Sequence, residues 1–292
     1  MSDKRSLGRL RFWRGVVVGT AVFLFAAFLI SPTLHALLLA WSVTGNQAAA
    51  EYSYAIAAGD VNGDGRIDLI VGSPKYESDT YTGGAAFVYH GYSGGFSDNP
   101  DWTSGSDLKG ARYGFAVASA GDINADGYDD VIIGAYRYNN GQSEEGRAYL
   151  YLGSSHGLHT APDWQFESDQ KDAHLGYAVA AAGDVNNDGF DDVLVGARWY
   201  QETLTSEGAA FLFFGSAAGL SETPNWTAVG GQAGAAFGTA VASAGDVNHD
   251  GYDDILIGAP FFDTTLEDAG AVYLFLGSET GPGSGAAWQA TG

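Results

Sequence analysis

A nine-residue acidic segment recurs four times in this chain at a constant step, and this periodicity restricts the possible folds more than any other feature. The segment has the pattern D-x-N-x-D-G-x-x-D and begins at Asp60, Asp122, Asp184 and Asp246. A tryptophan recurs at the same step, from Trp102 to Trp288. A fixed period of this length is the signature of a repeat protein, in which each repeat forms one supersecondary unit and neighbouring units share a core.

Each repeat carries four short strand signals separated by glycine-rich turns. In the second repeat the expected strands are Tyr113–Ala120, Asp130–Ala135, Gly146–Gly153 and Asp163–Glu167. Repeats of this kind predict an all-β propeller with four-stranded antiparallel blades, at about 46–105, 106–167, 168–229 and 230–292. A helical solenoid is excluded because the chain lacks the long amphipathic windows that such a fold requires.

The acidic segment has the composition of a calcium-binding loop. Oxygen-bearing side chains stand at positions 1, 3 and 5, glycine at position 6 permits a sharp reversal, and aspartate at position 9 closes the site. All-oxygen ligation of this density suits Ca²⁺, whereas Mg²⁺ prefers smaller octahedral sites and keeps more water. An EF-hand is excluded, because position 12 is Val71, Ile133, Val195 or Ile257 where that loop needs glutamate.

The alternative is that these residues only form hairpin turns, for which Asp-Gly and Asn-Gly pairs are common. Four copies that keep every ligand position favour four Ca²⁺ sites, each tying the first strand of a blade to the second. Position 7 would contribute its backbone carbonyl. The predicted ligands are Asp60, Asn62, Asp64, Arg66, Asp68, Asp122, Asn124, Asp126, Tyr128, Asp130, Asp184, Asn186, Asp188, Phe190, Asp192, Asp246, Asn248, Asp250, Tyr252 and Asp254.

Residues 1–40 differ in composition from the rest of the chain. A basic start up to Arg14 precedes an uncharged apolar run from Val16 to Ile30, and Ser31-Pro32-Thr33 interrupts that run. This order is typical of a secretory signal peptide, and the run is short for a bilayer span of about 20 residues. We expect cleavage near Ala36 or Ala40, with an uncleaved signal anchor as the alternative. The cleaved protein would be secreted or lie at the cell surface, without stable membrane insertion.

Composition narrows the function further. The chain has no cysteine, so disulfides are excluded and bound metal is a candidate brace for an exported fold. Its formal net charge of −22 argues against nucleic acid as a partner, which would require clustered Lys and Arg. The histidines of the repeats share no common position, and no nucleophile stands with a base. We therefore expect no catalytic residues and a binding role.

The four repeats with their acidic segments resemble the FG-GAP repeat, which occurs in the propeller of integrin α subunits and in many bacterial secreted proteins. The name-giving elements are Phe237-Gly238 and Gly258-Ala259-Pro260 in the last repeat, and the first repeat departs most, with Tyr52-Ser53 and Gly72-Ser73-Pro74. The resemblance covers about residues 41–292. It implies a seven-bladed propeller in the complete protein, with Ca²⁺ between the first and second strands of the blades, but says little about the ligand.

The segment Trp41-Ser-Val-Thr-Gly45 resembles the fourth-strand signal Trp288-Gln-Ala-Thr-Gly292. Propellers often close by letting one terminus complete a blade begun by the other, which hides two sheet edges. Because Trp288 already completes the fourth repeat, Trp41 belongs to a blade whose other strands are missing. We therefore expect a chain truncated at its C-terminus, with further blades in the intact protein.

The loops that join the second and third strands vary between repeats, and they lie on the face opposite to the acidic loops. Aromatic and basic side chains, which dominate binding hot spots, gather at matching positions in these loops. They are Lys75, Tyr76, Tyr136, Arg137, Tyr138, Arg198, Trp199, Tyr200, Phe261 and Phe262. Ordinary packing at the blade rim is the alternative interpretation of these side chains.

The sequence thus predicts a calcium-binding extracellular module for adhesion to a protein or glycan. An accessory propeller of a secreted hydrolase, with its catalytic domain outside this fragment, is the alternative. A purely structural surface protein is a third hypothesis, which the residues do not separate from the first.

Overall fold

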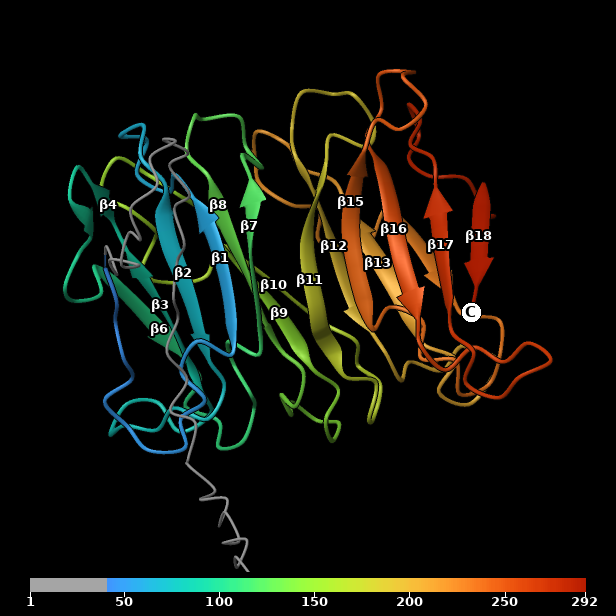
Figure 1. Cartoon of the computed structure of the whole chain (residues 1–292), viewed down its shortest axis with the longest axis horizontal. Helices are drawn as coiled ribbons and strands as arrows, with labels where there is room; N and C mark the ends of the chain where they lie inside the picture. Colours follow the sequence, from blue (N-terminus) through green and yellow to red (C-terminus); the bar gives the residue numbers. More distant parts are fainter. Residues whose placement is uncertain (1–40) are drawn as a thin grey trace, which may run out of the picture.

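The computed structural model describes residues 41–292, and the predicted signal segment 1–40 lies outside the described residues. Sixteen strands of the described part form four antiparallel sheets of four strands each, arranged one after another along the chain (Figure 1). Each sheet corresponds to one repeat, so the prediction of four-stranded propeller blades is confirmed. Within residues 41–292, no helix is long and apolar enough to cross a bilayer.

The strands of each blade pair in sequence order. Blade 1 consists of β1 (Ala55–Gly59), β2 (Asp68–Ser73), β3 (Ala85–Tyr89) and β6 (Trp102–Gly105). Blade 2 consists of β7 (Ala116–Gly121), β8 (Asp130–Ala135), β9 (Arg147–Tyr151) and β10 (Trp164–Glu167). Blade 3 consists of β11 (Leu175–Gly183), β12 (Asp192–Ala197), β13 (Ala209–Phe213) and β14 (Trp226–Val229). Blade 4 consists of β15 (Ala240–Gly245), β16 (Asp254–Ala259), β17 (Ala271–Phe275) and β18 (Trp288–Thr291). A small hairpin of β4 (Gly91–Tyr92) and β5 (Gly95–Phe96) lies between β3 and β6.

The strands predicted for the second repeat are found close to their expected bounds. The second strand, β8, begins and ends where the sequence placed it, and every residue of it is buried. The first strand begins at Ala116 instead of Tyr113. Gly114 has a φ of +78°, and the Phe115 N–H donates to the Arg112 carbonyl, so the chain turns here before it extends.

The hydrophobic core lies between successive blades. Between blades 2 and 3, Ile132 and Leu150 of blade 2 belong to one buried cluster with Val195 and Phe211 of blade 3. Equivalent clusters join blade 1 to blade 2 and blade 3 to blade 4. No blade therefore holds a complete core by itself, as expected for stacked repeats.

The recurring tryptophans contribute to these interfaces. Trp102 meets Tyr151 of the following blade edge-on, with the ring centroids 4.9 Å apart, and the next two tryptophans contact Phe213 and Phe275 in the same way. Trp41 lies against Tyr89 of blade 1 with a centroid separation of 5.8 Å. Because Tyr89 is the blade-1 equivalent of Tyr151, Trp41 contacts blade 1 as the fourth-strand tryptophan of a preceding blade would.

Candidate functional site

The four acidic loops lie at one end of the blades, the upper end in Figure 1, where the first strand of each sheet turns into the second. In blade 2 the Asp122 carboxylate accepts the N–H groups of Asp126 and Gly127 at 3.0 and 2.8 Å. The Asn124 side-chain oxygen accepts the Asp126 N–H at 3.2 Å, and the Asp126 carboxylate accepts the Tyr128 N–H at 3.2 Å. The oxygens of positions 1, 3 and 5 are thus folded into the turn.

The same contacts recur in the other three blades. The carboxylate at position 1 accepts the N–H groups of positions 5 and 6 in blade 1, blade 3 and blade 4, at 2.8–3.1 Å. Positive φ values at positions 4 and 6 allow this tight path, for example 56° at Ala125 and 90° at Gly127. A conformation of this kind favours glycine, which explains the glycine at position 6 of all four loops.

The aspartate at position 9 has a structural contact that the sequence did not indicate. Asp130 is fully buried, and its two carboxylate oxygens accept the N–H groups of Ile123 and Gly153 at 2.9 and 2.7 Å. It therefore joins the acidic loop to the connection between the third and fourth strands. The pKa of Asp130 is raised to about 7. Burial is the largest cause, the two backbone N–H groups oppose it, and the negative charges of Asp126 and Asp122 add to the rise.

A second unpredicted contact links consecutive acidic loops. The Asp129 carboxylate, at position 8 of blade 2, accepts the Asp60 N–H at 2.8 Å, and the Asp129 N–H donates to the Asp60 carbonyl at 3.0 Å. Asp191 and Asp253 make the same pair of bonds to the preceding blade. Position 8 of blade 1 is Ile67, which is exposed. The signal in the sequence was an aspartate at position 8 in every repeat except the first.

The ten candidate ligand residues occupy the opposite end of the blades, and the structure separates eight of them into two groups. One group is half-buried and packs on the third strand of its own blade. Its members are Tyr76 on Phe87, Tyr138 on Tyr149, Tyr200 on Phe211 and Phe262 on Tyr273. These four rings fill the blade rim, as the packing alternative expected.

The second group takes part in a continuous row of rings that crosses blades 1, 2 and 3. We call this row the aromatic strip, and its members are Tyr54, Phe115, Tyr136, His174, Tyr177 and Trp199. Adjacent rings have centroid separations between 4.3 and 4.9 Å from Tyr54 to Phe115, from Phe115 to Tyr136 and Tyr177, and from His174 to Trp199, with Tyr136 to His174 at 5.0 Å. Tyr54 and Trp199 remain accessible, with 53% and 36% of their surface exposed.

Two candidate arginines lie on the aromatic strip. The Arg198 guanidinium lies 4.0 Å from the Tyr177 ring centroid and 4.2 Å from that of Trp199, and Arg137 lies 5.5 Å from Tyr136. Arg137 also pairs with Glu144 at 3.5 Å. Within residues 41–292, Arg198 has no carboxylate within ion-pair distance. Lys75 and Phe261 lie outside the strip; Lys75 pairs with Glu51, and Phe261 is exposed.

His174 links Tyr136 to Trp199 within the strip. It is fully buried, its Nε2 is 2.8 Å from a Glu144 carboxylate oxygen, and its Nδ1 has no hydrogen-bond partner in the described part of the chain. Burial lowers the pKa of His174; the Glu144 carboxylate opposes that shift, and the Arg198 charge adds to it. The imidazole is therefore held in its neutral form and contributes a flat ring to the strip.

Comparison with known proteins identifies the repeat. The FG-GAP repeat model matches residues 52–89, 113–151, 175–213 and 237–275, which together make up more than half of the chain. This chain belongs to the FG-GAP repeat family. The resemblance inferred from the sequence is confirmed.

The FG-GAP chain is similar to integrin α subunits. It is 29% identical to integrin alpha-5 of Xenopus laevis over 270 residues, which cover 87% of this chain and 24% of that protein. It is 34% identical to integrin alpha-IIb of Mus musculus over 161 residues, which cover 52% of this chain and 15% of that protein. The chain thus spans about a quarter or less of the length of these relatives. The similarity to integrin α subunits agrees with the expectation of a chain that is not an enzyme.

A crystal structure of the exotype rhamnogalacturonan lyase YesX is similar with a TM-score of 0.42 and 14% identity, over 77% of this chain and 45% of that one. A likeness this weak carries no argument about function.

The glycines that give the FG-GAP repeat its name are contact points between blades. A Cβ atom added to Gly134, in the second strand of blade 2, would lie 2.0 Å from the carbonyl oxygen of Gly176, in the first strand of blade 3. Gly72 and Gly196 face the carbonyl oxygens of Gly114 and Gly238 in the same way, at 2.1 and 2.0 Å. The two glycines of the motif therefore let adjacent backbones touch, which explains their recurrence in every interface between the described blades.

Proposed function

We propose that this chain is a secreted or cell-surface binding module for an extracellular protein or glycan ligand, with its FG-GAP blades braced by Ca²⁺. The observation that carries the proposal is the division of the two ends of the blades. One end gathers the acidic loops, and the other carries the aromatic strip with its two arginines. The similarity to integrin α subunits supports an adhesion role, and no observation favours the hydrolase alternative.

The chemistry of the acidic loops fits Ca²⁺. Each loop presents carboxylate and amide oxygens from positions 1, 3 and 5 around a tight turn, beside the buried carboxylate of position 9. Burial is the main reason that the pKa of Asp130 is raised, and the negative charges of Asp126 and Asp122 add to the rise, so the three carboxylates of blade 2 repel one another when ionised. A hard divalent cation with flexible oxygen coordination relieves such repulsion. The loop residues of all four blades are our proposed ligands, with position 7 contributing its carbonyl.

The aromatic strip is our proposed ligand surface. Tyr and Trp rings provide contact area at low entropic cost, and Trp, Tyr and Arg are enriched in binding hot spots. Tyr136, Arg137, Arg198 and Trp199 are the candidate residues from the sequence that the strip brings together, and Tyr54, Phe115 and Tyr177 extend it across three blades. Arg198 has no acidic partner in the described chain, so it is available to a ligand.

The remaining parts of the proposal concern the whole protein. We propose that residues 1–40 direct export as a signal peptide and that the intact protein completes a seven-bladed propeller. The contact of Trp41 with blade 1 supports further blades, because it resembles the contacts that Trp102, Trp164 and Trp226 make with the next blade. Such a propeller would be extracellular or attached to the cell surface.

A retention assay tests the ligand surface. The purified chain is passed over arrays of extracellular-matrix proteins and glycans in calcium-containing buffer, and the retained ligand is used for variants. Trp199→Ala should reduce retention at least tenfold. Phe261→Ala is the matched control, because Phe261 stands at the same repeat position in blade 4, is 47% exposed and lies outside the strip. Equal retention of both variants would refute this surface.

A further inference from the structure

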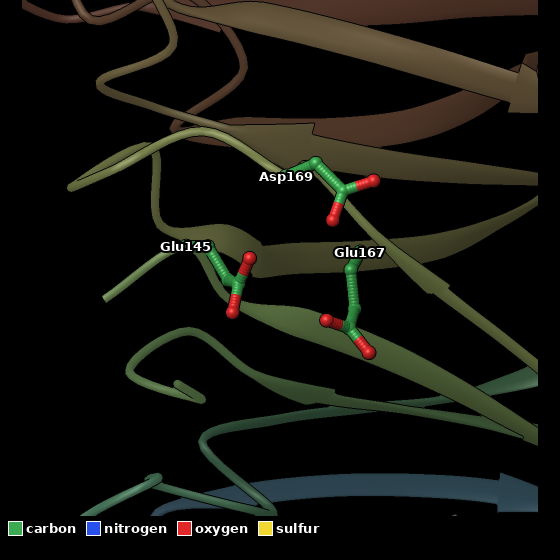
Figure 2. Close-up of side chains that lie close together, drawn as sticks. All are labelled: Glu145, Glu167 and Asp169. Atoms are coloured by element: carbon green, nitrogen blue, oxygen red, sulfur yellow. The ribbon is translucent and has the colours of Figure 1, made fainter. Parts of the chain in front are cut away.

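A second group of carboxylates lies at the end of blade 2 opposite to its acidic loop. Glu145 closely precedes the β9 strand, Glu167 ends β10, and Asp169 follows it in the connection to blade 3. One carboxylate oxygen from each residue lies within 4.8 Å of the other two. Figure 2 shows the three groups facing a common space between these segments.

Glu145 is an unusual member of this cluster, because it is fully buried and incompletely hydrogen-bonded. Its exposed fraction is 0%, and its Oε2 atom has no hydrogen-bond partner in the described part of the chain. Its Oε1 atom accepts the backbone N–H of Asn140. A buried carboxylate oxygen without a partner is costly, since it has lost its hydration without compensation. The free oxygen belongs to the residue that faces both other carboxylates.

The positive charge nearby is insufficient for three carboxylates. Arg147 pairs with Glu167, and the Asn140 side-chain amide lies 3.1 and 3.3 Å from the two Glu167 oxygens. The Arg147 guanidinium also stacks on the Tyr138 ring, 3.8 Å from the ring centroid. With one arginine against three carboxylates, the ionised cluster keeps an excess of two negative charges.

Blade 3 provides an internal comparison. Glu207 occupies the repeat position of Glu145 and is equally buried, but its Oε1 atom accepts the N–H groups of Glu202, Thr203 and Leu204 at 2.7–3.0 Å. Burial raises the pKa of Glu207, but these bonds outweigh burial and leave the pKa below its usual value. The residues of blade 3 that correspond to Glu167 and Asp169 are Val229 and Gly231.

The glutamates of the two neighbouring blades share one feature and differ in another. In both, the Oε2 atom has no hydrogen-bond partner in the described part of the chain. In blade 3 the Oε1 atom receives three backbone N–H groups, and no carboxylate stands at the two matching positions. In blade 2 it receives one N–H, and two further acids converge on it. Packing alone gives no reason to add negative charge where the stabilising donors are fewer, and a bound cation does.

We propose that Glu145, Glu167 and Asp169 bind a Ca²⁺ ion at the junction of blades 2 and 3, separate from the acidic loops. Three carboxylate oxygens within 4.8 Å of one another are close enough to bind one Ca²⁺ ion through bonds of about 2.4 Å. The ligands are hard oxygens, and their two excess negative charges match a divalent cation. The ion connects the start of β9 to the segment that enters blade 3.

The test is the calcium stoichiometry of the full chain, measured by isothermal titration calorimetry. The double variant Glu167→Val/Asp169→Gly copies the blade-3 residues at both positions, and circular dichroism verifies that it folds after the Arg147 ion pair has been removed. It should bind one Ca²⁺ fewer than the wild type and lose no other site. Asp126→Asn, in the acidic loop of blade 2, is the matched control and should leave the new site intact.

Two further measurements make the result decisive. Arg147→Gln removes a competing positive charge and should tighten binding at this site about tenfold, whereas a purely structural ion pair would give no gain in affinity. Crystals soaked in Mn²⁺ should show anomalous scattering between Glu145 and Asp169. An unchanged stoichiometry in the double variant, or no anomalous peak at Glu145, would overturn the proposal. Failure of the acidic loops to bind would leave one wild-type site, which the double variant would abolish.

Discussion

The indole N–H of Trp102 donates a hydrogen bond of 2.9 Å to the carbonyl oxygen of His159 in the next blade. Trp164 and Trp226 donate to the residues that stand at the same distance along the chain, 57 positions on, at 2.9 and 3.1 Å. Each interface between blades thus combines ring packing with one directed hydrogen bond. Because the indoles of Trp102 and Trp164 are buried against the following blade, their bonds have little competition from water.

Removing the indole N–H donor should weaken the interface between two blades while its aromatic packing is kept. Trp164→Phe keeps an aromatic ring beside Phe213 but leaves the Ser221 carbonyl without its donor. We expect a loss of about 1–3 kcal/mol in the free energy of unfolding, measured by chemical denaturation. Trp288→Phe is the control and should change stability by less than about 0.5 kcal/mol, since Trp288 is 52% exposed. Equal losses in both variants would argue against the interface bond.

The contact between motif glycines leads to a sharper prediction. Gly134→Ala would place a methyl group 2.0 Å from the Gly176 carbonyl oxygen, so the blades must separate. Overpacking of this kind costs about 1–3 kcal/mol, and the melting temperature should fall accordingly. Gly258→Ala makes the same change in blade 4, where the nearest atom is 3.4 Å away, and should be nearly neutral. A neutral Gly134→Ala would mean that the blades are less tightly apposed.

Calcium removal should lower the stability of the chain. A ligand that binds only the folded state stabilises it by about 2.7 kcal/mol per site at a hundredfold excess over Kd. We therefore expect the melting temperature, followed by circular dichroism, to rise with Ca²⁺ and to fall on chelation. Asp188→Asn keeps the size of the side chain but removes the charge of a proposed ligand. It should therefore reduce the rise in melting temperature that Ca²⁺ produces. A melting temperature indifferent to both Ca²⁺ and chelator would remove the basis for calcium bracing.

His174 should make the stability depend on pH. Burial places its folded pKa below 6.5, so between the two pKa values the unfolded chain binds more protons than the folded chain. Its contribution is complete above the unfolded pKa and is lost as the pH falls toward the folded value. Between about pH 7.5 and 5.5, on either side of the ordinary histidine pKa, the wild type should lose more stability than His174→Gln in matched denaturant titrations. Parallel profiles for the two proteins would contradict the assignment.

The fold was predictable because its information is local and periodic. The constant step from one acidic segment to the next defined the blades, and short apolar runs such as Asp130–Ala135 defined the central strands. The acidic loops were also visible, because the residues at positions 1, 3 and 5 are neighbours in sequence. Calcium binding by them stays a prediction.

Contacts between residues far apart in the sequence could not be predicted from local patterns. Asp130 was expected only as a ligand, and its bond to the Gly153 N–H depends on a partner 23 residues away in another connection. The aromatic strip combines Tyr54, Phe115 and Tyr177 with the predicted loop residues, and these rings come from three blades. The strip became visible only when the stacking of the blades had brought these positions together.

The reciprocal bonds between Asp129 and Asp60 have a consequence for how such chains evolve and are engineered. The aspartate at position 8 of one repeat exchanges two hydrogen bonds with the backbone at position 1 of the preceding repeat. Repeats 2 and 3 both carry the two halves of this contact, so their contact surfaces are interchangeable. A block that runs from one acidic loop to the next can then be duplicated or excised as a unit, and the two surfaces that newly meet already carry compatible chemistry. Cutting within a block would leave both halves unmatched, which makes the whole repeat the natural unit of genetic exchange.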